Sequence, residues 1–164
     1  MDPRTAPVLD EQLCFALYSA SLAMSKAYRP VLDALGLTYP QYLAMMVLWE
    51  HDARSVSEIG ERLHLDSGTL TPLLKRLEAS GLVERRRAAD DERRVEVRLT
   101  AAGRALRARA AGTPARMAAL TGCTADELVR LRRRLARLRD ALAQADGTPP
   151  ARPLPSPPPR TSPS

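Results

Sequence analysis

The 164-residue chain has few aromatic residues, few cysteines and no long apolar run. Aromatic residues are 4% of it, and Leu and Ala dominate the apolar residues, which favours helices over a β-sandwich. Two cysteines far apart in sequence form no disulfide framework of a small secreted domain. No apolar run reaches the length of a membrane span, and the N-terminus has no apolar signal segment. We therefore expect a cytoplasmic protein, mainly α-helical, with no membrane partner.

Groups that bind metals or activate substrates are also scarce. His51 and His64 stand alone, and neither Cys14 nor Cys123 has a Cys or His at ligand spacing. The chain has no Gly-rich phosphate loop and no nucleophile elbow. We expect no metal, no other cofactor and no enzymatic activity.

Positive charge is concentrated in the second half of the chain. The net charge is +6, with about −3 on residues 1–81 and about +9 on residues 82–164. A basic region of this kind favours a polyanion such as DNA, because it neutralises phosphates and releases counterions. Genomic Arg enrichment is an alternative, since 23 of the 25 basic residues are Arg.

Capping residues and a change of apolar period predict the secondary structure. A first helix spans residues 9–35, with a bend or an end at Pro30, and a second runs from Pro40 to His51. Ser55 and Glu58 form a capping box for a third helix. Asp66 caps a fourth, over residues 67–80, in which Pro72 interrupts the backbone hydrogen bonding.

Alternating residues then predict a β-hairpin with strands at 82–87 and 94–99. Thr100 caps a fifth helix, and Thr124 caps a sixth. The sixth has a narrow leucine seam, formed by Leu128, Leu131, Leu135, Leu138 and Leu142. The fold class is thus mainly α, a winged helix-turn-helix in the order α-α-α-α-β-β-α-α with a helical dimerisation region. Four segments follow: a first dimerisation helix (1–35), the winged helix-turn-helix (36–100), C-terminal dimerisation helices (101–145) and a disordered Pro-rich tail (146–164).

Leucine-rich helices with polar outer faces occur in any small helical domain and do not by themselves indicate a function. The order of the elements is more specific, and it predicts DNA binding. The fourth helix would enter a major groove, and its polar side chains would meet bases and phosphates. They are Ser67, Thr69, Thr71, Lys75 and Arg76. The hairpin offers arginines for an A·T-rich minor groove. They are Arg85, Arg86, Arg87, Arg93 and Arg94.

Four separate segments resemble the MarR family of winged-helix regulators, in its organic-hydroperoxide-sensing (OhrR) branch. The segment LDSGTLTPLLKRLE at 65–78 resembles the recognition helix, and 91–100, which begins with Asp91 and contains Arg93, resembles the wing. EQLCFALY at 11–18 resembles the segment with the peroxide-sensing cysteine, and TYPQYL at 38–43 matches the same branch. The resemblance covers residues 8–145 and implies a homodimer on a palindromic operator.

The resemblance also implies that Cys14 is a reactive thiol. Without it, a lone Cys on an apolar helix face is usually a small buried hydrophobe. Tyr18 lies one turn from Cys14, and the resemblance makes Tyr28 and Tyr39 hydrogen-bond donors to the partner subunit's thiolate. It also makes Cys123 the residue that resolves oxidised Cys14 as an intersubunit disulfide. Organic hydroperoxides would then be the inducer.

Apolar residues around these segments could accept an organic tail, although each could equally be ordinary core. They are Phe15, Leu17, Leu22, Met45, Met46 and Trp49. Three alternatives remain: a MarR-type repressor relieved by a reversible lipophilic or phenolic ligand, a thiol peroxidase, and a structural dimer module.

Overall fold

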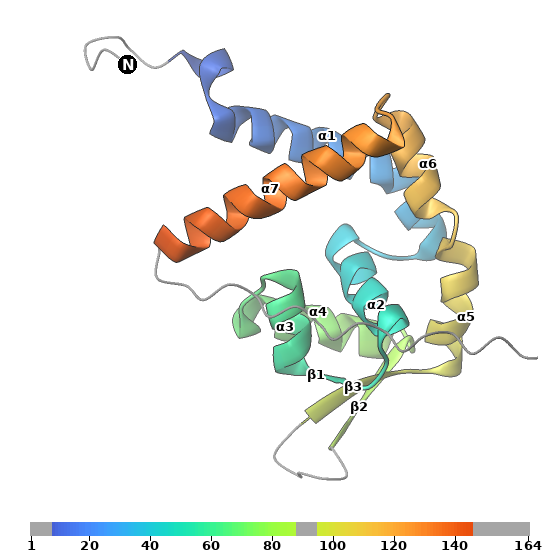
Figure 1. Cartoon of the computed structure of the whole chain (residues 1–164). Coiled ribbons are helices and arrows are strands. Elements are labelled where there is room, and N and C mark those ends of the chain that lie inside the picture. The colour runs from blue at the N-terminus through green and yellow to red at the C-terminus, as the bar shows by residue number, and fades with distance from the viewer. Residues whose placement is uncertain (1–7, 88–94, 146–164) are drawn as a thin grey trace, which may run out of the picture.

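Seven α-helices and three short strands make up the part of the chain described by the computed structural model, residues 8–87 and 95–145 (Figure 1). In chain order they are a 3-10 turn (Leu9–Glu11), α1 (Leu13–Leu35), α2 (Tyr39–Glu50), β1 (Arg54–Ser55), α3 (Val56–Leu63), α4 (Ser67–Ala79), β2 (Val83–Arg87), β3 (Val95–Leu99), α5 (Ala101–Ala110), α6 (Thr113–Leu120) and α7 (Ala125–Ala145). The expected winged-helix class is confirmed, with one more helix and one more strand than the sequence predicted.

Side-chain caps fix where five of these helices begin, including α7, where Thr124 accepts from the Glu127 N–H (3.3 Å). Ser55, Asp66 and Thr100 each accept a hydrogen bond from the backbone N–H three residues later, as the sequence predicted. A second capping box, between Thr38 and Gln41, starts α2 at Tyr39. The start predicted from the sequence, Pro40, is one residue too late.

Two prolines lie inside helices without ending them. α1 continues past Pro30 to Leu35 and ends at Gly36, which has a left-handed φ of 69°. α4 is helical from Ser67 through Pro72 to Ala79. Each proline leaves the carbonyl four residues earlier without a helical donor. Those carbonyls belong to exposed residues, Lys26 and Gly68, so water can satisfy them.

The single helix predicted to follow Thr100 is two helices. α5 ends at Ala110, and α6 begins at Thr113 with Pro114 in its first turn. Pro114 has no N–H to donate to the carbonyl of Ala110, and its ring crowds that carbonyl. The break therefore follows from the proline, which the sequence analysis did not use.

The three strands form an antiparallel sheet in the order β1-β3-β2. The hairpin register pairs Val83 with Leu99 and Arg87 with Val95. β1 adds Arg54 and Ser55 to the outer edge of β3, a strand too short for any alternation to reveal. Helices α2, α3 and α4 pack against this sheet. The core they enclose includes fully buried Leu48, Ile59, Leu74, Leu77 and Val97.

One joint holds α5 against both the sheet and the end of α4. Thr100 donates from its hydroxyl to the carbonyl of Gly81 (2.6 Å) and from its N–H to that of Leu82 (3.1 Å). The Trp49 indole N–H, from α2, donates to the carbonyl of Gly103 (2.9 Å). Asp52 accepts from the Leu99 N–H (2.8 Å). We call these contacts the α5 joint.

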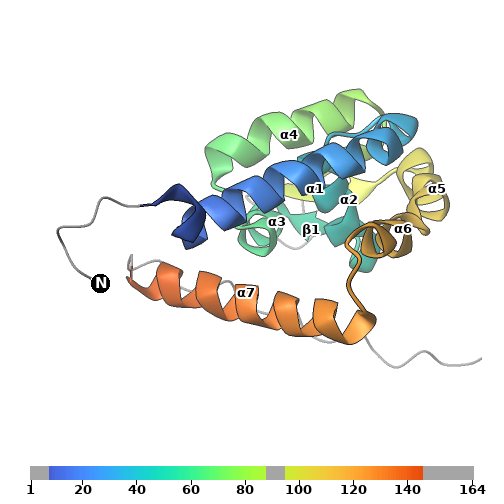
Figure 2. The same cartoon turned by 90° about the horizontal axis from the view of Figure 1, so that it is seen from above.

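Helices α1 and α7 extend away from this core. Figure 2 shows α4 and α7 at opposite edges of the molecule. No residue of α7 is buried, and Leu131, Leu135 and Leu142 in its leucine seam are exposed. Within the described ranges, no single helix has the length and hydropathy of a membrane span, and α1 with α2 passes that test only as a pair bent by 67°.

Gly103 leaves no room for a side chain. A Cβ there would overlap the carbonyl oxygen of Leu82, whereas one at Gly112 would meet no atom within 4 Å. We expect Gly103→Ala to lower the free energy of unfolding by about 1–3 kcal/mol through overpacking, and Gly112→Ala to change it little. Urea denaturation measures both. Equal stability of the two variants would contradict the close contact at the α5 joint.

Candidate DNA-binding and thiol sites

A tight turn positions α4 against α3. His64 ends α3 in the left-handed conformation, with φ 55°, and Asp66 begins the next helix two residues later. The Asp66 carboxylate accepts from the backbone N–H (2.9 Å) and the hydroxyl (2.9 Å) of Thr69. These hydrogen bonds hold the pKa of Asp66 below its usual value. The turn is therefore a helix-turn-helix, with a permanent negative charge at the start of α4.

The side chains predicted to contact DNA lie along one accessible side of α4. Ser67, Thr69, Lys75 and Arg76 are exposed, and Thr71 is half-buried. Within residues 8–87 and 95–145, neither Lys75 nor Arg76 forms a side-chain hydrogen bond or an ion pair, so both are free for phosphates or bases. The hydroxyl proton of Thr69 is already donated to Asp66.

Arg85 was predicted to face DNA from the wing, but in this structure its side chain is bound to Glu78. Its guanidinium donates twice to Glu78 at the end of α4 (2.9 and 2.6 Å), and its backbone N–H donates to the same carboxylate. These bonds hold the pKa of Glu78 below its usual range. Arg85 therefore fixes the wing to the recognition helix. Arg86 pairs with Glu84 (3.0 Å).

Arg87, also predicted to contact DNA, is exposed at the end of β2. The remaining wing residues predicted to contact DNA, Asp91, Arg93 and Arg94, lie outside the described residues.

Cys14 is exposed in the first turn of α1, and Tyr18, one turn later, is 62% exposed. Tyr28 instead belongs to a cluster with Tyr39 and Tyr42, at ring-centroid distances of 4.9 and 6.1 Å. Burial, and then the neighbouring phenols, raise the pKa of Tyr28, so its hydroxyl stays a donor at neutral pH. Along α1, Tyr28 lies about 21 Å from Cys14 at 1.5 Å per residue, too far to contact it within one chain.

Cys123 lies in the turn between α6 and α7, next to Gly122, which has a left-handed φ of 68°. Its thiol is exposed and faces the carbonyl of Thr121 (3.7 Å). Thr124 and Glu127 then form the capping interactions predicted for the last helix. Both cysteines of the chain are therefore accessible free thiols in this structure.

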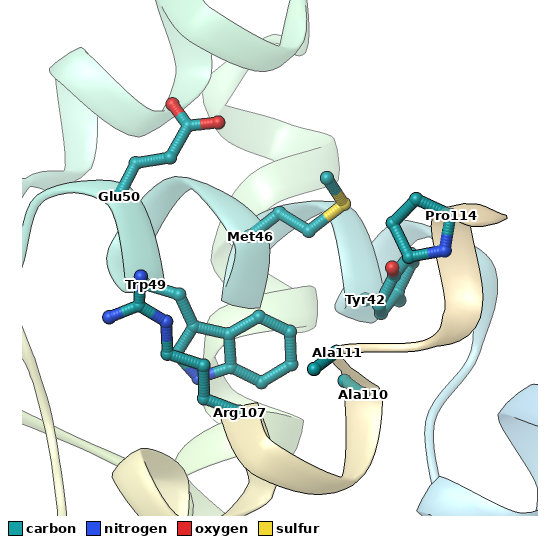
Figure 3. A pocket seen from close by; sticks show the side chains of 8 residues that line it. All are labelled: Tyr42, Met46, Trp49, Glu50, Arg107, Ala110, Ala111 and Pro114. Atoms are coloured by element: carbon teal, nitrogen blue, oxygen red, sulfur yellow. The ribbon is translucent and has the colours of Figure 1, made fainter.

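An open pocket of about 190 Å³ lies between α2 and the α5–α6 corner (Figure 3). Its lining residues are Tyr42, Met46, Trp49, Glu50, Arg107, Ala110, Ala111 and Pro114. Of the apolar residues suggested from sequence, only Met46 and Trp49 line it, and Met45 is fully buried in the core. Arg107 was not expected, because only the tertiary packing of α5 against α2 brings it there.

Comparisons with known proteins place this geometry in a family. A family model described as "Transcriptional regulator SarA/Rot" matches residues 26–109. The chain is 52% identical over 147 residues to an "HTH-type transcriptional regulator TtmR" of Methylorubrum extorquens, covering 90% of this chain and 74% of the relative. It is 46% identical to the "Organic hydroperoxide resistance transcriptional regulator" of Bacillus subtilis, covering 83% and 92%.

Solved structures agree. DNA-bound, overoxidized AbfR, a protein of Staphylococcus epidermidis, matches with a TM-score of 0.64 at 36% identity, covering 82% of this chain and 94% of that one. PcaV of Streptomyces coelicolor with its natural ligand matches with a TM-score of 0.75 at 26% identity, covering 84% and 99%. The chain belongs to the MarR/SarA-type winged-helix family of transcriptional regulators. Its named relatives are DNA-binding regulators rather than enzymes.

The Glu78–Arg85 contact should matter for DNA binding. Glu78→Gln removes the charge that orients Arg85, so the wing loses its fixed angle to α4. We expect affinity for a duplex selected by the wild-type protein to fall about fivefold, the equivalent of about 1 kcal/mol. Fluorescence anisotropy measures this, with Glu84→Gln as the control because its pair with Arg86 is more exposed. Equal effects of the two substitutions would exclude a positioning role.

Proposed function

We propose that the protein is a redox-sensing repressor, which binds palindromic operator DNA as a reduced dimer and leaves it when an organic hydroperoxide oxidises Cys14. The observation that supports it most is an exposed thiol at Cys14 in a chain that is 46% identical to an organic hydroperoxide resistance regulator. A DNA target also favours a cytoplasmic location.

DNA binding would use α4 in a major groove and the wing in the adjacent minor groove. Lys75 and Arg76 have the free charge for phosphate or guanine contacts, and Ser67, Thr69 and Thr71 have short polar side chains near the helix start. Asp91 and Arg93 would complete the wing contact. Residues 36–100 would therefore read one half of the palindrome.

A second copy of the chain would cover the apolar surfaces of α1 and α7. Leu13 and Leu22 on α1, and Leu131, Leu135 and Leu142 on α7, are 40–61% exposed. Helices with such surfaces are stable when another helix packs on them. Residues 1–35 and 101–145 would thus form the dimer, which places two DNA-reading units on one two-fold axis.

The distance between Cys14 and Tyr28 along α1 also favours a dimer. The Tyr28–Tyr39 cluster cannot reach Cys14 of its own chain, but a partner's α1 running antiparallel would bring the partner's Cys14 to it. Phenol hydroxyls would then donate to the thiolate and stabilise the nucleophilic form. Tyr18 would support the same thiolate from one turn away.

The chemistry needs only the peroxide and two thiols. The Cys14 thiolate attacks one peroxide oxygen, the O–O bond breaks, and the alkoxide leaves and takes a proton to become an alcohol. Cys14 is then a sulfenic acid. Cys123 of the other subunit attacks its sulfur as a thiolate, hydroxide leaves and is protonated to water, and an intersubunit disulfide forms. Because a disulfide needs Cα atoms within about 7 Å, this step would move the helices that carry both cysteines.

The α5 joint would carry that movement to DNA. α5 connects the C-terminal dimerisation helices with the sheet, and its first turn is hydrogen-bonded to the end of α4 and to α2. A shift of α5 would therefore turn the recognition helix with it and change the spacing between the two half-site contacts. Oxidation would favour the conformer that does not fit the operator.

Two cysteine variants test the proposal. We expect Cys14→Ser to bind the selected duplex like wild type but to stay bound after cumene hydroperoxide, because serine forms no sulfenic acid. Cys123→Ser should still be oxidised at Cys14 but should form no intersubunit disulfide. Anisotropy follows DNA release, and a non-reducing gel follows the covalent dimer. Release of Cys14→Ser by peroxide, or a disulfide-linked dimer of Cys123→Ser, would contradict the assigned roles.

A second candidate function is relief by a reversible phenolic ligand. The pocket of Figure 3 combines the Trp49 and Tyr42 rings with the Arg107 guanidinium, a lining that suits an aromatic carboxylate. PcaV, which matches this chain in fold, was solved with its natural ligand. The pocket contacts α2 and α5 close to the α5 joint, so a ligand there would act on the same connection.

Hydroxybenzoate binding distinguishes this candidate from the redox one. If the pocket is the sensor, salicylate should release wild-type protein from DNA in the presence of reductant. Arg107→Gln should then need about tenfold more salicylate for release, because the charged hydrogen bond from Arg107 to the salicylate carboxylate is lost. Arg116→Gln, on the neighbouring α6, is the control. Release that occurs only under oxidising conditions would exclude the ligand function for salicylate.

A further inference from the structure

Helix α7 carries four arginines in a single stripe. Arg130, Arg133, Arg134 and Arg137 recur at intervals of three and four residues, which places them on one face of the helix. All four are exposed, and no acidic residue occurs between Arg130 and Arg139. Within the described ranges 8–87 and 95–145, none of the four has an ion-pair or side-chain hydrogen-bond partner. We call them the arginine stripe.

The other faces of α7 have different contacts. Val129, Ala136, Asp140 and Ala143 form one half-buried side of the helix, and Leu128 and Leu138 in the leucine seam are half-buried as well. A second face holds the leucine seam proposed to contact the other subunit. Helical spacing puts the arginine stripe on a third face. It therefore stays exposed both in the single chain and in a dimer packed through the seam.

Repulsion between the four arginines of the stripe destabilises α7, and an anionic partner would relieve it. Like-charge pairs three and four residues apart destabilise a helix, and the stripe contains four such pairs, two at each spacing. Asp126 and Asp140 flank it, and Asp140 is already paired with Arg139 (2.7 Å). A polyanion would convert the repulsion into binding by neutralising all four guanidinium groups together.

We propose that the arginine stripe binds the phosphate backbone of a second DNA duplex, so that one operator-bound dimer holds two DNA segments. This inference rests on the proposed DNA binding by α4. The stripe contains no aromatic or large apolar side chain, whereas the centre of a protein interface needs such anchors. Phosphate contacts need only exposed, sequence-independent cations. The composition of the stripe thus fits DNA rather than an acidic protein.

The position of α7 indicates that the stripe meets a different duplex from the one read by α4. In Figure 1, helices α2 and α3 lie between α7 and the strands of the wing. In Figure 2, α4 and α7 lie at opposite edges of the molecule. Most of α7 therefore lies away from a duplex held by α4 and the wing, and only its C-terminal end, with Arg139 and Asp140, comes near His64 of the helix-turn-helix.

A two-duplex capture assay tests the inference. Biotinylated duplex selected by the wild-type protein is immobilised in excess over protein, so that every α4 is occupied, and a labelled random-sequence duplex is then added. We expect wild-type protein to retain the labelled duplex and to lose it as salt rises. Arg133→Gln/Arg137→Gln should retain at least about tenfold less, with a salt slope smaller by about 2. The control is Arg116→Gln/Arg132→Gln, which removes the same charge elsewhere.

Each result has a definite meaning. No binding to the immobilised duplex by wild-type protein would overturn the proposed function itself. Binding to it without capture of the second duplex would overturn only this inference and would leave an acidic protein as the partner to seek. An equal loss of duplex capture in the control variant would show that capture depends on the total positive charge rather than on the arginine stripe, and would overturn the inference. A weakened dimer or weakened first-duplex binding in Arg133→Gln/Arg137→Gln would place the stripe in those interfaces instead, and would also overturn the inference.

Discussion

The rest of the structure depends on the α5 joint, where Thr100 and the first turn of α5 are hydrogen-bonded to the α4–β2 turn and to α2. Thr100 and Gly103 lie against the carbonyls of Gly81 and Leu82 in the turn between α4 and β2, and Trp49 reaches the same part of α5 from α2. Asp52 accepts a hydrogen bond from the N–H of Leu99, the last residue of β3, next to this turn. The hydrogen bond from Trp49 to Gly103 is buried, and a buried hydrogen bond is costly to break. The DNA-reading unit and α5 must therefore move together, which lets a change in the dimerisation helices alter DNA binding.

The two proposed triggers act on opposite sides of this connection. The thiol chemistry would act at the start of α1 and the α6–α7 turn, where both cysteines are exposed. The pocket lies between α2 and the α5–α6 corner, against Trp49 itself. A regulator of this architecture can thus respond to a covalent change or to a ligand through one mechanical element. One relative, 46% identical, is named an organic hydroperoxide resistance regulator, and for this reason the covalent trigger is the first proposal.

Much of the fold was predictable because the signals are local. The caps at Ser55, Asp66 and Thr100, and the alternation in β3, involve residues within a few positions of each other. The misses arose where the decisive partner is distant in sequence. β1 forms by pairing with the edge of β3, and Arg85 is bound to Glu78 because β2 folds back on α4.

The candidate sites likewise contain some residues that the sequence indicates and others that only the tertiary structure brings into place. A resemblance in sequence identified Cys14, Tyr28 and Tyr39 as candidates, but only the structure brings Tyr39 and Tyr42 to Tyr28. Arg107 in the pocket had no signal in the sequence, since its role depends on how α5 packs on α2. Pro114, which splits the predicted fifth helix, was visible in the sequence and was overlooked.

The central claim is that oxidation of one thiol per subunit switches DNA binding. Reduced wild-type protein on its selected duplex is titrated with cumene hydroperoxide, and each sample is divided between anisotropy and intact-protein mass spectrometry. The account predicts that release tracks the loss of Cys14 thiol, is complete near one equivalent per subunit and reverses with dithiothreitol. Full oxidation of Cys14 with the duplex still bound, or release while that thiol remains reduced, would contradict it.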